Sequence, residues 1–311
     1  MVYLLVVLSL VLVIVGAMLL TDGSVALAKR LRVPEFIVGL TVVAVGTSMP
    51  ELTVSLISSF EGSGDMAIGN VVGSNIFNVL VILGVCALVA PIIFSKSNIR
   101  RDIPLAVATS VALVVVTLLN ENITRFEGLL LLVGYAVMMW YTIRAEKRAM
   151  SAAPAHEEVQ GSSMPAWRIP VWIILGLAGL IFGGDMFVDS ASDIAREWGV
   201  SEATIAITLV AGGTSLPELA SSVVSILRGS PSLALGNVLG SCVANILLIL
   251  GVCSTVNPLT MGDVAMSDIY VALGAVCLLM LSALIIGRDK LTRGEGLLFV
   301  VAYVVYIYTL L

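Results

Sequence analysis

Long apolar stretches separated by short polar loops dominate this 311-residue chain. A helix needs about 20 consecutive apolar residues to cross the hydrocarbon of a bilayer. The first stretch lacks the basic residues that begin a signal peptide, so we expect it to remain as a helix. We predict ten transmembrane helices, at residues 2–20, 34–60, 66–93, 102–120, 126–144, 169–190, 201–227, 233–256, 266–287 and 296–311.

Composition excludes a soluble protein. Hydrophobic residues make up 59% of the chain and charged residues only 12%, whereas soluble domains carry about 25% charged residues. The net charge of -5 gives no indication of a nucleic-acid partner. The four cysteines lie in apolar runs without CxxC spacing, which favours packing over metal binding. We therefore expect the lipid bilayer as the main partner, with no cofactor, no nucleic acid and no obligate protein partner.

The basic residues are distributed unevenly between the two sides of the predicted membrane. Loops that follow odd-numbered helices contain 14 of the 16 Lys and Arg residues, and only Arg125 and Arg196 fall on the other side. Cytoplasmic loops collect Lys and Arg. The pattern predicts that both termini lie outside the cytoplasm.

The two halves of the chain repeat each other. A shift of 167 residues aligns Thr41–Pro91 with Thr208–Pro258 without a gap, and 28 of the 51 aligned positions are identical. Each half holds five predicted spans, an odd number, so the second copy enters the membrane from the opposite face. We predict an all-α membrane protein of two inverted-topology five-helix repeats, residues 1–144 and 169–311, joined by a polar cytoplasmic linker at 145–168.

The first repeated motif is GTSMPEL (46–52), with GTSLPEL (213–219) as its partner, and each falls near the middle of a span. Pro50 and Pro217 have no amide hydrogen, so a backbone carbonyl one turn earlier loses its helical partner. A free carbonyl in hydrocarbon costs several kcal/mol unless something replaces that partner. A bound cation, a Thr or Ser hydroxyl, or a water molecule could do so.

Each of these motifs carries one intramembrane acid, Glu51 or Glu218. Such an acid costs at least ~2.5 kcal/mol and generally has a functional role. Residues four apart share one helical face, and both acids lie on faces lined with hydroxyl groups. These are Thr47, Ser55 and Ser58 around Glu51, and Thr214, Ser222 and Ser225 around Glu218. Carboxylates with hydroxyls are hard oxygen ligands, which suit Na+ and Ca2+.

The second repeated motif is GNVVGSNIFN (69–78), matched by GNVLGSCVAN (236–245). Its GxxxG spacing lets helix backbones approach closely. The motif also carries a polar face that packing does not require, and its amides could ligate a cation or form interhelical hydrogen bonds. The polar residues of this face are Ser74, Asn78, Ser241 and Asn245.

The other acids within or at the ends of the predicted spans do not require an ion-binding role. Asp22 and Asp189 match across the repeat but lie at predicted helix ends, where capping or solvation suffices. Asp185 is deeper, yet its partner in the first half is Met18. We do not expect these acids to bind the ion directly.

Together these motifs resemble the cation/Ca2+ exchanger superfamily, in its prokaryotic Na+/Ca2+ exchanger branch. The resemblance covers the whole chain, including both signatures, GTSxPE and GNxxGS, in each repeat. It implies an antiporter of the cell (inner) membrane, rather than an enzyme, that transports Na+ and Ca2+ through sites shared by Glu51 and Glu218. The other ligands that it implies are the carbonyls of Ala44 and Ala211, the hydroxyls of Thr47, Ser48, Thr214, Ser215, Ser74 and Ser241, and the side chains of Asn78 and Asn245.

The chain departs from part of this family at Asn245, where many prokaryotic and K+-dependent members carry Asp. Two carboxylates then remain instead of three, which favours K+-independent transport. The H+/Ca2+ branch typically has Asn-Ala-Thr in place of the Gly-Thr-Ser seen here. Na+ coupling is therefore favoured over the alternative of an H+/Ca2+ (or other divalent cation) antiporter.

The charges of the two carboxylates suggest a mechanism of obligatory exchange. One Ca2+ or two Na+ neutralise them, whereas the empty site holds two like charges that repel in low dielectric. An additional Na+ would make transport electrogenic. A cation channel also uses acidic residues and carbonyls, but inverted repeats with interrupted helices favour a carrier. We expect the first and sixth spans to slide over a fixed centre made by spans two, three, seven and eight.

Overall fold

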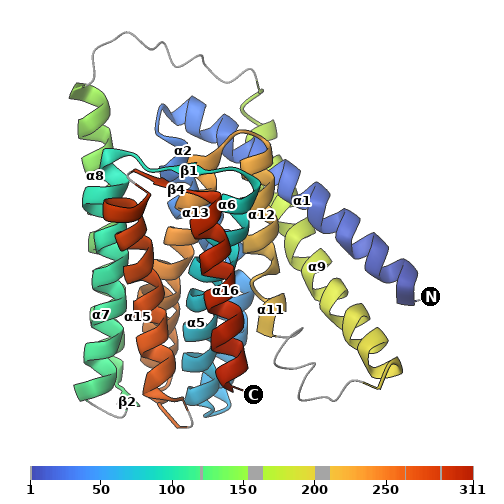
Figure 1. The fold of residues 1–311 in the computed structure, drawn as a ribbon, viewed down its shortest axis with the longest axis vertical. Coiled ribbons are helices and arrows are strands. Elements are labelled where there is room, and N and C mark those ends of the chain that lie inside the picture. Colours follow the sequence, from blue (N-terminus) through green and yellow to red (C-terminus); the bar gives the residue numbers. More distant parts are fainter. Residues whose placement is uncertain are drawn as a thin grey trace.

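The computed structural model describes residues 2–119, 122–152, 164–199, 211–262, 264–287 and 289–310, and it is almost entirely helical (Figure 1). Within these residues, eight helices are long and apolar enough to cross a membrane. A ninth span consists of Glu35–Thr47 and Met49–Phe60, which meet at a 46° bend. The predicted seventh span is described only from residue 211 onward. The prediction of an all-helical membrane protein is confirmed.

Most predicted spans correspond to observed helices. The first repeat contains α1 (Val2–Leu31), α2 (Glu35–Val38), α3 (Ala44–Thr47), α4 (Met49–Phe60), α5 (Gly64–Phe77), α6 (Leu83–Val89), α7 (Ile103–Leu119) and α8 (Arg125–Ala152). The second contains α9 (Arg168–Glu197), α11 (Ala211–Gly213), α12 (Leu216–Leu227), α13 (Pro231–Val243), α14 (Leu250–Val256), α15 (Met266–Leu281) and α16 (Arg293–Leu310). Wider π-helical turns connect several of them, namely η1 (Gly39–Val43), η2 (Asn78–Ile82), η3 (Asn98–Asp102), η5 (Ala244–Ile249) and η6 (Ser282–Ile286).

Two short β-ribbons reveal the inverted relationship of the repeats. Strand β1 (Ile92–Ile93) pairs with β4 (Lys290–Leu291), and β2 (Asn122–Ile123) pairs with β3 (Leu259–Thr260), both antiparallel. Each ribbon thus joins one repeat to the other. The β1–β4 ribbon lies at the upper end of the bundle and β2 at the lower end (Figure 1). Repeat-related strands at opposite ends are what an inverted duplication requires.

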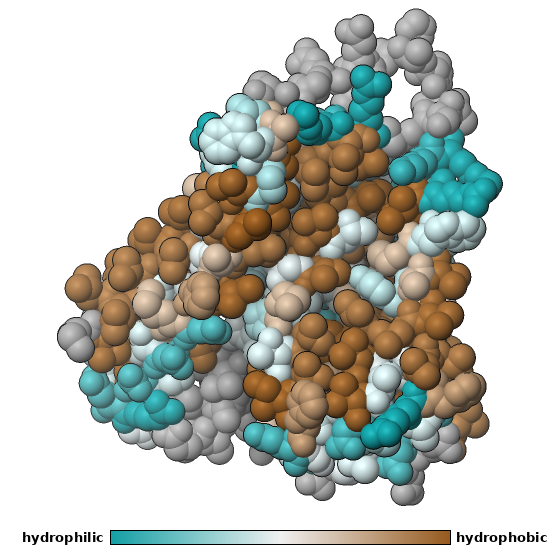
Figure 2. All heavy atoms as spheres, turned by 180° about the vertical axis from the view of Figure 1, so that it is seen from behind, coloured by the Kyte–Doolittle hydropathy of each residue, from teal (hydrophilic) through white to brown (hydrophobic). Residues whose placement is uncertain are grey.

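The surface has the character of a membrane protein. On the face shown in Figure 2, hydrophobic residues cover the middle of the molecule, and hydrophilic residues gather toward its two ends. Large apolar side chains are exposed along the outer helices, for example Leu4 (70%) on α1 and Ile174 (64%) on α9. Such exposure in water would be costly, so these faces contact lipid.

Helices α1 and α9 form a pair that inclines away from the remaining bundle (Figure 1). Their buried apolar residues form a second, smaller cluster, which also includes Val38, Val43, Val224 and Leu233 of the neighbouring helices. Glycines bring the two backbones together, since a Cβ at Gly16 would lie 2.8 Å from the amide nitrogen of Leu180. The expected moving helices therefore form one tightly packed unit.

Polar contacts also tie α1 to α12. The buried hydroxyls of Thr21 and Ser225 lie 3.1 Å apart. Asp22 and Arg228 form a partly exposed ion pair at 3.5 Å, a type worth about 0–1 kcal/mol. Sliding of α1 must break these two contacts. The mainly apolar sequence of α1 does not predict them.

One of the two GxxxG pairs packs helix against helix. A Cβ at Gly240 would lie 2.5 Å from the carbonyl oxygen of Leu40, so this pair brings α13 against η1. Gly69 and Gly73 of the other pair line a pocket of about 300 Å³ among the described residues. The residues that match Phe36–Leu40 in the repeat, 203–207, lie outside the described residues, so close packing at this pair stays a prediction.

The close approach at Gly240 predicts a cost for one substitution. Gly240→Ala should lower the thermal midpoint of the purified protein, because overpacking against backbone costs about 1–3 kcal/mol. Gly134→Ala on α8 is the control, because its Cβ would come no closer than 4.0 Å to a described atom, Cδ2 of Leu247, and it should change the midpoint little. Equal losses from the two substitutions would contradict this account of the packing at Gly240.

Candidate ion-binding site

The two glutamates of the repeated GTSxPE motifs each lie just after a break in a helix. The first break is at Ser48, between α3 and α4, and the second is at Ser215, between α11 and α12. Proline occupies the first turn of the helix that follows each break, where its missing amide hydrogen costs nothing. Glu51 and Glu218 therefore lie in the first turns of α4 and α12, where the helix dipole favours negative charge.

The amides predicted for the middle of the site lie on π-helical turns. Asn78 begins η2, and Asn245 is the second residue of η5. A π-helical turn inserts an additional residue into a helix and is frequently found at functional sites. Its presence in both repeats shows that the duplication preserved this local distortion as well as the residues.

Hydrogen bonds across the repeats bring the predicted serines and glutamates together. Ser48 donates to Oε1 of Glu218 (2.8 Å), and Ser215 donates to Oε1 of Glu51 (3.1 Å). Ser241 lies 3.0 Å from the Ser48 hydroxyl. The two glutamates are 1% and 0% exposed. Each repeat thus supplies an acid and the hydroxyl that contacts the other repeat's acid.

Several buried oxygens at this centre have no hydrogen-bond donor among the described residues. They are Oε2 of Glu51, Oε2 of Glu218, Oδ1 of Asn78, Oδ1 of Asn245 and Oγ1 of Thr214. A buried polar atom without a partner costs about 1–3 kcal/mol, so such atoms are rare in native proteins. Four of the five are acceptors only, and they form two repeat-related pairs. Oxygen acceptors in this arrangement suit a hard cation such as Na+ or Ca2+.

Two of the remaining predicted residues, Thr47 and Ala44, have hydrogen-bond partners in the structure. Thr47 donates to the carbonyl of Val43 (3.0 Å) and lies 3.2 Å from the amide oxygen of Asn237. The Ala44 carbonyl accepts a hydrogen bond from the Ser48 amide (3.0 Å), and the Thr47 hydroxyl lies 3.4 Å from it. Ser74 is buried on α5. Ala211 begins the described part of the seventh span, and residues 200–210 lie outside the described residues.

Two asparagines that the motif analysis did not single out hold the helices that carry the acids. Asn70 donates to the Glu51 carbonyl (3.2 Å) and to the Ser55 hydroxyl (3.0 Å). Asn237 makes the equivalent contacts to the Glu218 carbonyl (3.4 Å) and to Ser222 (2.9 Å). Both repeats have asparagine at this position, four residues before the predicted serine. This identity could have indicated them from the sequence.

A third asparagine has no counterpart in the other repeat. Asn75 accepts a hydrogen bond from Nδ2 of Asn245 (3.0 Å) and donates to the backbone carbonyl of Cys242 (3.1 Å). The position that matches Asn75 in the second repeat is Cys242 itself. Because comparison of the repeats highlights identity, it could not reveal this residue.

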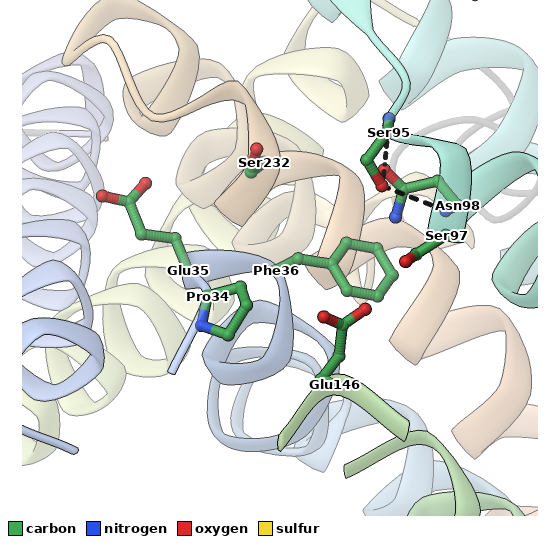
Figure 3. Close-up of a pocket in the computed structure, with 8 residues that line it drawn as sticks. All are labelled: Pro34, Glu35, Phe36, Ser95, Ser97, Asn98, Glu146 and Ser232. Atoms are coloured by element: carbon green, nitrogen blue, oxygen red, sulfur yellow. Dashed lines mark hydrogen bonds between the residues drawn. The ribbon is translucent and has the colours of Figure 1, made fainter. Parts of the chain in front are cut away.

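Other acids do not form a comparable centre. Within the described part of the chain, no group of three or more His, Cys, Asp or Glu residues could hold a metal ion. Asp185 and Asp189 are exposed on α9. A pocket of about 260 Å³ contains Glu35 and Glu146, but their carboxylates point in different directions (Figure 3). Glu146 instead pairs with Arg101, which also binds Asp102.

Comparison with known proteins agrees with this site and fold. The family model described as "Sodium/calcium exchanger protein" matches residues 1–144 and 168–311. The chain is 37% identical to "Putative antiporter CaxA" of Alkalimonas amylolytica, over 97% of this chain and 96% of that protein. It is 30% identical to "Sodium/calcium exchanger MaX1" of Methanosarcina acetivorans, over 99% and 98% of the two chains.

A solved structure shows the same architecture. The sodium-calcium exchanger NCX_Mj, soaked with 10 mM Na+ and zero Ca2+, superposes with a TM-score of 0.86, at 31% identity and 100% coverage of both chains. The repeated motifs, the fold of the described residues and these matches agree with one another. The chain is a member of the sodium/calcium exchanger family, whose members are integral membrane transporters that exchange cations.

Proposed function

We propose that this protein exchanges Na+ for Ca2+ by alternating access, with Glu51 and Glu218 shared by both ions. The observation that carries the proposal is the pair of buried Oε2 atoms of Glu51 and Glu218, for which the described part of the chain supplies no hydrogen-bond donor. Each acid also accepts a hydrogen bond from a serine of the other repeat: Glu218 from Ser48 at 2.8 Å, and Glu51 from Ser215 at 3.1 Å. The proposed ligands around them are Thr47, Ser48, Thr214, Ser215, Ser74, Ser241, Asn78 and Asn245, with the carbonyls of Ala44 and Ala211.

The charge of the site supports obligatory exchange. Two carboxylates are neutralised by one Ca2+ or by two Na+, so the loaded carrier can close around the site. The empty carrier would enclose two repelling charges in a low dielectric. A third Na+ bound through neutral oxygens would carry net charge across the membrane and make transport electrogenic.

Vesicles with a single imposed gradient test this proposal against its alternative. A Na+ gradient should drive uptake of radioactive Ca2+ into vesicles that contain the purified protein, and a pH gradient should not. Uptake driven only by the pH gradient would favour H+/Ca2+ exchange. Ca2+ flux that needs no ion on the opposite side would indicate a channel.

We expect transport to be independent of K+. Only two acids lie at the described centre, and position 245 supplies a neutral amide. Na+-driven uptake should therefore be equal with and without K+, and the Asn245→Asp variant should gain K+ stimulation. A several-fold K+ stimulation of the native protein, measured in the same vesicles, would overturn this prediction.

We also propose that both termini face away from the cytoplasm, in the cell (inner) membrane. The beginning of α1 and the end of α16 both lie in the lower half of the molecule as drawn in Figure 1. The opposite end holds most Lys and Arg residues, including those on the proposed cytoplasmic linker at 145–168 that would join repeats 1–144 and 169–311. Labelling of single cysteines from either side of a cell tests this orientation.

A further inference from the structure

Which atom of Asn245 faces the ion decides whether this side chain attracts or repels a cation. An asparagine amide presents an acceptor oxygen on one side and two N–H donors on the other. Rotation by 180° about the last side-chain bond exchanges the two with little change in shape. At a buried cation site the oxygen favours binding, and the amide hydrogens oppose it.

The orientation of Asn245 follows from a chain of hydrogen bonds that starts at a backbone carbonyl. The Cys242 carbonyl can only accept, so its partner in Asn75 must be the amide nitrogen, at 3.1 Å. The Asn75 oxygen is then directed toward Asn245, and it too can only accept. Asn245 must therefore donate through Nδ2, at 3.0 Å. Its Oδ1 is buried, and no residue that the structure describes donates to it.

We propose that Asn75 is a positioning residue that fixes the amide of Asn245 with its oxygen toward the bound cation. This inference rests on the proposed function. Asn75 and Asn245 are 3% and 0% exposed, so water does not compete for these bonds. Asn245 lies one helical turn after Ser241, on the face that contacts Ser48, and its Oδ1 belongs to the same centre as the glutamates.

The arrangement exists in one half of the molecule only. Cys242 replaces Asn75 in the second repeat, and its side chain offers no amide to orient Asn78. An Asp at position 245 would present oxygen in either orientation and would not need such a residue. The neutral amide at 245 and the orienting amide at 75 thus form a functional pair.

A double-mutant cycle tests this role. Asn75→Leu should raise the Ca2+ concentration for half-maximal Na+-driven uptake about tenfold, as expected for loss of a residue that orients a ligand. In the Asn245→Ala background no amide remains to be oriented. There, Asn75→Leu should change the Ca2+ concentration for half-maximal uptake less than about twofold. If Asn75→Leu prevents folding, Asn75→Ala removes the same contacts with a smaller side chain.

Ser59→Ala is a matched control, because Ser59 also donates to a carbonyl across the repeats, that of Cys253 (2.9 Å), away from the acids. It should lower the thermal midpoint and leave half-saturation unchanged. Equal effects of Asn75→Leu in both backgrounds, or no effect in the native one, would overturn the inference. The same double-mutant cycle can be measured without transport, from equilibrium Ca2+ binding to the purified variants. If the native protein showed no Na+-driven uptake, only the proposed function would be refuted.

Discussion

Vesicles that contain the Glu51→Gln or the Glu218→Gln variant should show no measurable Na+-driven Ca2+ uptake. Glutamine keeps the size of the side chain but removes one of two charges that balance Ca2+ in a buried site. Removing one partner from a buried ionic interaction costs about 3–5 kcal/mol, which corresponds to a loss of affinity of roughly 100- to 4000-fold. Uptake of radioactive Ca2+ under a fixed Na+ gradient measures this loss.

Glu61→Gln provides the control. Glu61 follows the last residue of α4, the helix that carries Glu51, but it is exposed. Its replacement should leave uptake unchanged, and all three variants should elute as folded protein from gel filtration. Retained exchange in either Glu51→Gln or Glu218→Gln would show that the acid does not share the transported ion.

A disulfide between α1 and α12 should abolish exchange while leaving Ca2+ binding intact. Thr21 and Ser225 are suitable positions, because their hydroxyls lie 3.1 Å apart in the structure and disulfides need closely spaced Cβ atoms. The bond would fix the α1–α9 pair to the helices that carry the ligands. If that pair must slide for the site to face the other side, the oxidised Thr21→Cys/Ser225→Cys variant can bind ions but cannot turn over.

The same variant after reduction is its own control and should regain exchange. The four native cysteines are buried or partly buried, so the single-cysteine variants should show no effect of oxidation. Exchange at the native rate with the disulfide fully formed would exclude the sliding mechanism. Loss of Ca2+ binding on oxidation would instead mean that the bond distorts the site.

The sequence predicted which segments span the membrane better than it predicted where their helices end. Spanning depends on apolar length, which the sequence displays directly. The helices α1 and α9 have 30 residues each and continue beyond the predicted 2–20 and 169–190. Helix α8 enters the predicted linker as far as Ala152, because Ala, Glu, Lys and Arg favour helix even where they are too polar for the membrane.

The candidate site was predicted to the extent that the repeats are identical. Both glutamates and both serines of GTSxPE appeared twice in the sequence, and the structure brings all four together. The crossed pairing, in which each serine contacts the other repeat's acid, depends on how the repeats pack. The π-helical turns at Asn78 and Asn245 also have no simple sequence signal, and Asn75 is hidden because Cys242 replaces it in the second copy.

The location of bound Ca2+ tests the central claim most directly. Anomalous scattering from a crystal grown with Ca2+ should show one strong peak between Glu51 and Glu218, at about 2.3–2.6 Å from their carboxylate oxygens. Transfer of that crystal to excess Na+ without Ca2+ should remove the peak, because both ions use the same carboxylates. A Ca2+ peak away from both glutamates, or one that persists in Na+ at concentrations that drive exchange, would contradict the shared site.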